Sequence, residues 1–169
     1  VLLNLIGLDR SSVVWIDEVV VNDPAKELAL HGVFRSGVFS GFDGFDQTYL
    51  WLPPVHPLIT SLVYKLFGFG IWQTRVPVVF FGGCAIVVLY FIARHFFNSH
   101  RTASFSAIVF ALNPQFIHTT RSGRMDALCL LLSFMAIFFF VQSTGNRNRT
   151  LYVSLSGLLA GLAGMTHPI

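Results

Sequence analysis

The chain has 169 residues, of which 54% are hydrophobic and only 11% are charged, and its mean hydropathy is +0.67. Soluble domains carry about 25% charged residues, so this composition excludes an ordinary soluble protein. The net charge of +3 does not indicate a nucleic-acid-binding protein either, because the basic residues stand singly or in pairs at the edges of apolar runs. An integral membrane protein is therefore expected.

Residues 1–16 form the first apolar stretch, and without the basic segment and cleavage site of a signal peptide they predict the tail of a helix. A bilayer-crossing helix needs about 20 largely apolar residues. Uncharged runs near that length follow at residues 76–93, 102–117, 127–146 and 150–166. The predicted fold is all-α, a polytopic bundle of transmembrane helices, and we expect residues 1–169 to be the N-terminal part of a larger transmembrane domain. Within the second run, Asn113-Pro114 is expected to kink or end the helix.

Counting the crossings places the loops on two sides of the cell membrane. The loop at residues 17–75, the loop at 118–126 and the chain end at His167 share one side, whereas the loops at 94–101 and 147–149 face the other. These last two loops contain basic residues and no acidic ones, so the positive-inside rule places them in the cytoplasm. All eight acidic residues then fall on the extracytoplasmic side.

The long extracytoplasmic loop exceeds what a connection between two spans requires, so it is expected to contain structure of its own. Asp23-Pro24 predicts a helix start and Gly32 a helix end, which gives a short amphipathic helix at the membrane surface. Residues 36–54 combine glycines, serines and aromatic residues and predict a loop at headgroup depth. Residues 58–69 predict a second interfacial or re-entrant helix; if they crossed the bilayer, every later assignment of sides would invert.

Asp17 and Glu18 come where the first apolar stretch ends, and they are the first candidate site. Carboxylates at that place are also typical of a solvated helix boundary. The long loop on the same side favours a functional interpretation, because its further acids and scattered basic groups suit a charged substrate at the membrane surface.

Basic groups on the same side form the second candidate site. His56 lies between prolines, which predicts a ring presented by a stiff, non-helical backbone, although a single loop histidine is often only a surface residue. Arg121 and Arg124 precede Asp126, so the acid can pair with one guanidinium and leave the other for a phosphate. The alternative to a phosphate-binding role is that the two arginine side chains only extend toward the polar membrane interface. His167 ends the last run and is equally consistent with a polar helix cap.

Taken in order, these features resemble a known family. The chain contains an acidic pair after the first apolar stretch, an Asp-Pro helix start, a PPxxPL stretch, an LFG followed by WxxR, and an RxD that opens a later span. This order resembles the GT-C glycosyltransferases, in the branch of the protein O-mannosyltransferases, the aminoarabinose transferases of lipid A and the RgtA/B/C/D-like enzymes. The residues that carry the resemblance are Asp17, Glu18, Asp23, Pro24, Pro53, Pro54, His56, Pro57, Leu66, Phe67, Gly68, Trp72, Arg75, Arg124, Met125, Asp126, Thr166, His167 and Pro168.

The resemblance implies a transferase that moves a sugar from a polyprenyl phosphate to a protein, lipid or glycan acceptor outside the cytoplasm. Carried over, Asp17 would be the general base for the acceptor hydroxyl, and Glu18 would orient or support it. A positioned base contributes roughly 10²- to 10⁴-fold to a rate. The leaving phosphate needs nearby positive charge, for which the candidates are Arg124, Arg121, His56 and His167.

A divalent cation, Mg²⁺ or Mn²⁺, is a further implication. Some members of the family place a Glu just before the basic residue of the proline stretch and use it to hold a metal, but Val55 stands there in this chain. Oxygen ligands would then have to come from Asp126 with Asp43 or Asp46.

A membrane transporter or channel subunit is the main alternative, and a scaffold subunit is another. Transporters place charged residues or broken helices near the middle of the bilayer. The four apolar runs contain no Asp, Glu, Lys or Arg, and a scaffold would not gather carboxylates and arginines on one face. The clustering therefore favours the enzyme.

Overall fold

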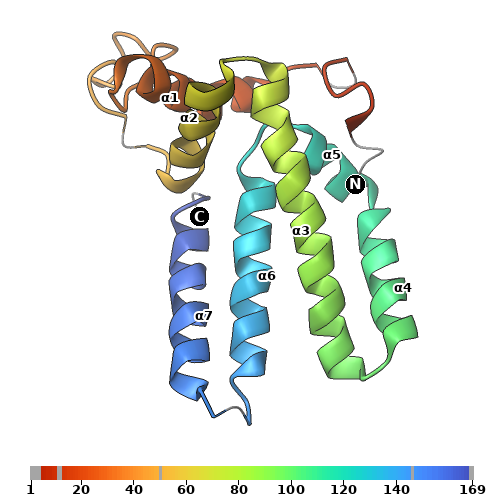
Figure 1. The fold of residues 1–169 in the computed structure, drawn as a ribbon. Helices are drawn as coiled ribbons and strands as arrows, with labels where there is room; N and C mark the ends of the chain where they lie inside the picture. Colours follow the sequence, from red (N-terminus) through yellow and green to blue (C-terminus); the bar gives the residue numbers. More distant parts are fainter. Residues whose placement is uncertain (1–4, 11–12, 50, 146, 168–169) are drawn as a thin grey trace.

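The computed structural model describes residues 5–10, 13–49, 51–145 and 147–167, and these contain helices and no strand (Figure 1). The helices are α1 (Ile16–His31), α2 (Val55–Phe67), α3 (Ile71–Phe97), α4 (His100–Ala111), α5 (Pro114–Arg121), α6 (Asp126–Gln142) and α7 (Arg149–Gly164). Helices α3, α4, α6 and α7 run alongside one another, and α1, α2 and α5 gather at one end of this bundle (Figure 1). The all-α prediction is confirmed.

Among the described residues, α3 alone is long and apolar enough to cross a membrane as a single helix, with 27 residues. Helices α5 and α6 pass the same test only as a pair that bends by 116°. Helices α6 and α7 coincide with the runs predicted at 127–146 and 150–166, but they are shorter, with 17 and 16 residues.

The break predicted at Asn113-Pro114 is confirmed. The side chain of Asn113 accepts hydrogen bonds from the backbone N–H groups of Gln115, at 2.9 Å, and Phe116, at 3.2 Å, so it caps a new helix. Pro114 occupies the first turn of α5, where its missing N–H costs nothing. The run at 102–117 is therefore divided between α4 and α5 instead of forming one span.

The helix predicted over residues 1–16 is wrong for the part that the structure describes, while residues 1–4 and 11–12 lie outside it. Residues 5–10 form turns, and 13–15 are not helical. Two arginines occupy carbonyls that a helix would use: Arg75 donates to the oxygen of Leu8 at 2.6 Å, and Arg121 donates to that of Ile6 at 2.9 Å.

Helix α1 starts earlier than predicted and passes through Pro24, which lies inside it. Asp23 does not cap a helix; its carboxylate accepts from the hydroxyl of Ser36, at 2.8 Å, and from the N–H of Val38, at 3.0 Å, and so fixes the following loop. The predicted end is correct, because Gly32 follows the helix with a φ of 71°, a conformation that favours glycine.

The loop after α1 packs its aromatic residues against that helix. Tyr49 is fully buried and lies in a core with Val21, Leu52 and Met125. Phe39 and Phe45 of the predicted headgroup loop pack against this core and are partly buried, whereas Phe42 and Trp51 are each 60% exposed. This packing holds α1 across the end of the bundle.

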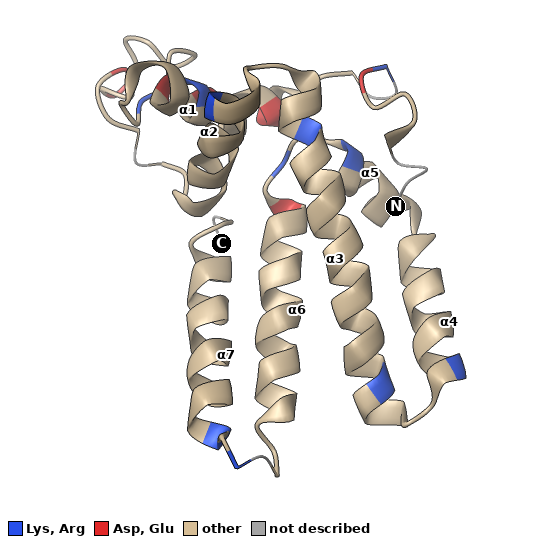
Figure 2. Cartoon of the chain, in the orientation of Figure 1, with Lys and Arg blue, Asp and Glu red and all other residues tan. Residues whose placement is uncertain are grey.

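The charged residues separate between the two ends of the bundle (Figure 2). The ends joined by the α3–α4 and α6–α7 connections carry basic residues and no acidic ones, and the acidic residues of the described chain lie at the end with α1 and α2. The predicted grouping of the loops is thus seen in the fold.

Candidate functional site

Four side chains form a row at the end of the bundle where the acidic residues gather. Arg124 Nη1 lies 3.4 Å from Asp17 Oδ2, and Arg124 Nε lies 3.1 Å from Asp126 Oδ2. His167 Nε2 lies 3.4 Å from the other oxygen of Asp126. The structure therefore brings together four of the predicted site residues, with Arg124 between the two carboxylates.

Each member of the row comes from a different part of the chain. Asp17 lies in the first turn of α1, Arg124 in the connection between α5 and α6, Asp126 at the start of α6, and His167 just after α7. All four are partly exposed, and Asp17 is the most accessible, with 48% of its side chain exposed. Among the described residues, the carboxylate of Asp17 is therefore the part of the row most open to solvent.

The Arg124–Asp126 contact leaves hydrogen-bonding capacity within the row. Arg124 Nε and Asp126 Oδ2 are close, but neither buried atom has a hydrogen-bond partner with good geometry among the described residues. Buried polar atoms without hydrogen-bond partners favour the binding of a polar group that supplies the missing hydrogen bonds.

Glu18 differs from Asp17 although it is the next residue. It is 5% exposed, and its two oxygens accept from Nε and Nη2 of Arg75 at 2.7 and 2.8 Å. Arg75 is fully buried in the first turns of α3. Such a two-bond pair fixes geometry as well as charge. The contacts suit the supporting role predicted for Glu18 and leave it no surface for a substrate.

Sequence reasoning missed three residues that complete this network, namely Arg75, Asn22 and Gly123. Arg75 was named only as the arginine of the WxxR stretch and was given no role, although an ionisable residue at the edge of an apolar helix often pairs with another charged group. The Gly123 N–H donates to Glu18 at 2.9 Å, and the Asn22 amide donates to the Gly123 carbonyl at 2.5 Å. No local sequence pattern predicts these two hydrogen bonds, because the bonded residues are about a hundred positions apart in the sequence.

His56 lies inside the fold and not in a loop. It belongs to the first turn of α2 and is 2% exposed, so the prediction of a non-helical, presented ring is wrong. Pro57 is accommodated because N–H groups in the first turn of a helix need no partner within it. Nε2 of His56 lies 3.4 Å from both Asn22 Oδ1 and Thr60 Oγ1. The polar contacts of its ring are therefore with Asn22 and Thr60 and not with Arg124.

Burial lowers the pKa of His56 from 6.5 to about 4, and the charge of Asp126 opposes this shift only in part. The unfolded chain therefore binds a proton that the folded chain does not, between about pH 6.5 and pH 4. The free energy of unfolding is therefore highest above pH 6.5. It decreases by on the order of 3 kcal/mol as the pH falls through this window. We expect the apparent Tm of wild type minus that of His56→Gln to be constant above pH 6.5 and to fall below it. A difference that stays constant down to pH 4 would contradict a buried neutral imidazole.

Arg121 is turned away from the row. It donates to the carbonyl oxygens of Ile6 and Gly7, at 2.9 and 3.4 Å, and so holds the N-terminal segment beside α5. Of the cations predicted to bind the donor phosphate, the structure thus places Arg124 and His167 in the row, and it places Arg121 and His56 outside it.

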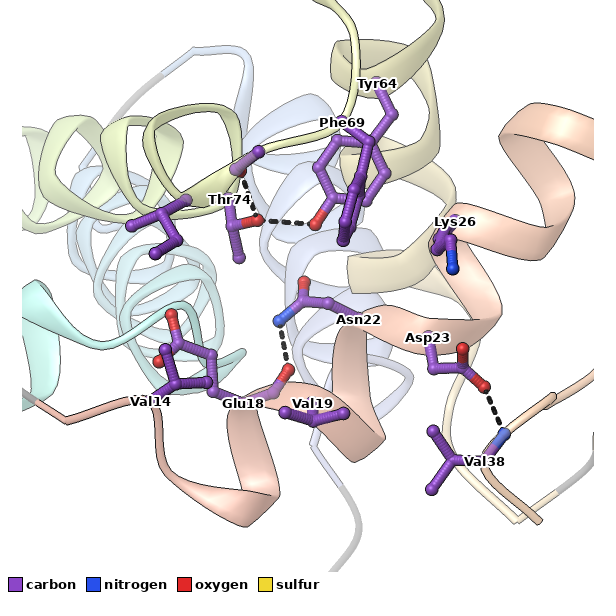
Figure 3. Close-up of a pocket in the computed structure, with 12 residues that line it drawn as sticks. Val14, Glu18, Val19, Asn22, Asp23, Lys26, Val38, Tyr64, Phe69 and Thr74 are labelled. Atoms are coloured by element: carbon purple, nitrogen blue, oxygen red, sulfur yellow. Dashed lines mark hydrogen bonds between the residues drawn. The ribbon is translucent and has the colours of Figure 1, made fainter. Parts of the chain in front are cut away.

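A pocket of about 420 Å³ lies beside α1 (Figure 3). Glu18, Asn22 and Lys26 line it from one face of that helix, and Tyr64 and Thr74 close it from α2 and α3. Asp17 is not among its lining residues. The row itself borders two other cavities: one of about 390 Å³ is lined by Asp126, and one of about 370 Å³ is lined by His167.

A divalent-metal site is not formed by the described residues. They include no group of three or more His, Cys, Asp or Glu side chains that could hold a metal ion. The oxygens of Asp126 face Arg124 and His167 instead of further carboxylates. The expected divalent cation therefore stays a prediction.

Solved structures share this fold. The crystal structure of ArnT from Cupriavidus metallidurans in the apo state superposes with a TM-score of 0.79 at 21% identity. The crystal structure of the same protein bound to undecaprenyl phosphate gives 0.82 at 22% identity. In both cases the match covers 98% of this chain and 30% of the other, so the chain spans about a third of the length of ArnT. No curated protein matches the chain.

The chain thus shares the helical fold of ArnT over nearly its whole length. Residues 52–168 match the family described as dolichyl-phosphate-mannose-protein mannosyltransferase, and the chain belongs to this family. Both findings confirm the resemblance drawn from the sequence, and they make the protein a membrane protein.

Proposed function

We propose that this chain is part of a glycosyltransferase that transfers a sugar from a polyprenyl phosphate to an acceptor outside the cytoplasm. The observation that carries the proposal is the row in which an accessible carboxylate, Asp17, contacts a guanidinium, Arg124, that is held by a second carboxylate. The family supports a sugar transfer, and a structurally similar protein, ArnT, has been crystallised with undecaprenyl phosphate.

In the proposed reaction, the acceptor oxygen attacks the anomeric carbon of the sugar and gives its proton to Asp17. The bond between that carbon and the phosphate oxygen breaks, and polyprenyl phosphate leaves with the electron pair. A base within hydrogen-bond reach of the acceptor contributes roughly 10²- to 10⁴-fold to such a step. The half-exposed carboxylate of Asp17 is suited to this role because the acceptor has access to it.

Arg124 and His167 would stabilise the charge that develops on the leaving phosphate. A planar guanidinium can bind two phosphate oxygens at once. Asp126 contacts both cations, so it would orient them toward the phosphate. Because Arg124 also contacts Asp17, a bound phosphate would draw the guanidinium toward itself and leave the carboxylate to accept a proton.

The distribution of basic residues supports a proposal for the side of the membrane on which the row lies. Arginines lie in the last turn of α3, the first turn of α4, the α6–α7 connection and the first turn of α7, at the end of the bundle opposite the row (Figure 2). Cytoplasmic loops are enriched in Lys and Arg. We therefore assign the row to the extracytoplasmic face of the cell membrane, where a protein, lipid or glycan acceptor would meet the donor.

The test is a transfer assay with the purified full-length protein in detergent or liposomes. Polyprenyl-phosphate sugars and nucleotide sugars are offered as donors to a panel of protein, lipid and glycan acceptors. We expect sugar transfer, with release of polyprenyl phosphate, only from the lipid-linked donors. Transfer from nucleotide sugars at an equal rate would contradict the proposal, and so would a lack of transfer from every lipid-linked donor.

A further inference from the structure

The backbone of Gly123 is held on both sides of its Cα by side chains of α1. Its N–H donates to Glu18 Oε1 at 2.9 Å, and its carbonyl accepts from the Asn22 amide at 2.5 Å. Glu18 and Asn22 are one turn apart on the same face of α1, and both are 5% exposed. A loop peptide fixed in this way cannot turn or slide without breaking a buried hydrogen bond.

The two side chains that hold Gly123 are themselves fixed. Glu18 is bound through two hydrogen bonds by the fully buried Arg75, and the Asn22 amide also donates to the backbone oxygen of Glu18 at 2.7 Å. Figure 3 shows Glu18 and Asn22 side by side on α1, with Thr74 facing them from α3. Helices α1 and α3 therefore form a rigid holder for the loop between α5 and α6.

The fit at Gly123 leaves no room for a side chain. A Cβ at this position would lie 2.3 Å from Thr74 Cγ2 and 2.7 Å from Glu18 Oε1. Neither neighbour is free to move, because the Thr74 hydroxyl is bonded to Tyr64 at 2.6 Å and to the carbonyl of Gly70 at 2.9 Å. The backbone can lie this close to α1 only because the residue is glycine.

Gly123 directly precedes Arg124, and Glu18 directly follows Asp17. Helix α1 therefore supplies both the candidate base, Asp17, and the next residue, Glu18. Glu18 accepts the hydrogen bond that fixes the backbone directly before Arg124, the candidate phosphate ligand. The distance between Asp17 and Arg124 is set by this arrangement and not by the long, partly exposed side chain of Arg124 alone.

We propose that Asn22 and Gly123 are positioning residues that hold Arg124 between Asp17 and Asp126. This inference rests on the proposed function, because it assigns Arg124 a role in sugar transfer. Displacing a reacting group by about 1 Å can cost on the order of 10²-fold in rate. The consequence is a pair of buried residues that touch no substrate and yet control the rate through Arg124.

The experiment is a double-mutant cycle with the full-length protein. Transfer from a polyprenyl-phosphate sugar is measured for wild type, Asn22→Ala, Arg124→Lys and the double variant. We expect Asn22→Ala to lower kcat/KM for the donor by about 10- to 100-fold in the wild type and by less than about threefold in the Arg124→Lys background. The matched control Asn148→Ala, at the far end of the bundle, should stay close to wild type. Equal losses in both backgrounds would show a general effect on the fold and overturn the inference.

Gly123→Ala provides the second arm if Asn22→Ala folds poorly. It should lower kcat/KM to a similar degree, and Thr74→Ser, which removes the nearest methyl group, should restore part of the loss in the double variant. Undiminished activity of Gly123→Ala, or no recovery in the double variant, would contradict the proposal. An inactive wild type would instead contradict the proposed function, so the two failures are distinguishable.

Discussion

Asp17→Asn is expected to lower sugar transfer by about 10²- to 10⁴-fold and to leave the fold unchanged. The amide has almost the same shape as the carboxylate but cannot accept the proton of the acceptor hydroxyl. Asp17 is 48% exposed, and its contact with Arg124 is 3.4 Å long, so its replacement should cost little stability. Initial rates with a polyprenyl-phosphate sugar, measured beside the apparent Tm, separate the two effects.

The matched control for this substitution is Asp9→Asn. Asp9 carries the same carboxylate and contacts only the exposed Arg10, at 3.8 Å, among the ion pairs of the described residues. Transfer by this variant should equal that of wild type. If Asp17→Asn kept an undiminished rate, Asp17 would not be the base, whatever the control showed.

Breaking the Glu18–Arg75 pair is expected to have the greatest effect on stability. Arg75→Met leaves the Glu18 carboxylate buried without its partner, and loss of one member of a buried pair costs about 3–5 kcal/mol. Both side chains are almost completely buried, so solvent cannot compensate. The apparent Tm and the fraction of monodisperse protein after purification in detergent measure this loss.

The double variant Glu18→Leu/Arg75→Met distinguishes the buried charge from the packing. Replacing a whole buried pair by apolar residues is often neutral or stabilising, so the double variant should recover most of the apparent Tm. It should not recover transfer, because the acceptor for the Gly123 N–H is gone. The exposed pair offers the control: Arg10→Met should leave the Tm unchanged. A double variant that is as unstable as Arg75→Met would show that the ion pair itself is required for folding.

The apolar runs of the sequence were sufficient to locate α3, α6 and α7, because a long uninterrupted apolar run favours a helix. The break at Asn113-Pro114 and the end of α1 at Gly32 were equally readable, since both depend on local backbone chemistry. The start of α1 could not be predicted from the sequence. Two arginines from distant parts of the chain take the carbonyls of the N-terminal segment, and a local pattern does not reveal such contacts.

The row of the candidate site was predicted in part. The order of motifs suggested Asp17, Arg124, Asp126 and His167, and the count of crossings placed them at one end of the bundle. The sequence did not distinguish the accessible Asp17 from the buried Glu18, because burial depends on Arg75, which is 57 residues away. It also did not predict the burial of His56, since a proline-rich stretch reads as loop while its prolines fit the first turn of α2.

A structure of the full-length protein with a bound polyprenyl phosphate examines the site directly. We expect a phosphate oxygen within about 3 Å of Arg124 or His167, on the side of the row that Asp17 faces. The Arg124–Asp17 contact of 3.4 Å should lengthen as the guanidinium turns to the phosphate. A phosphate bound elsewhere, for example in the pocket beside Lys26, with the row unchanged, would contradict the assignment of this row as the site of sugar transfer.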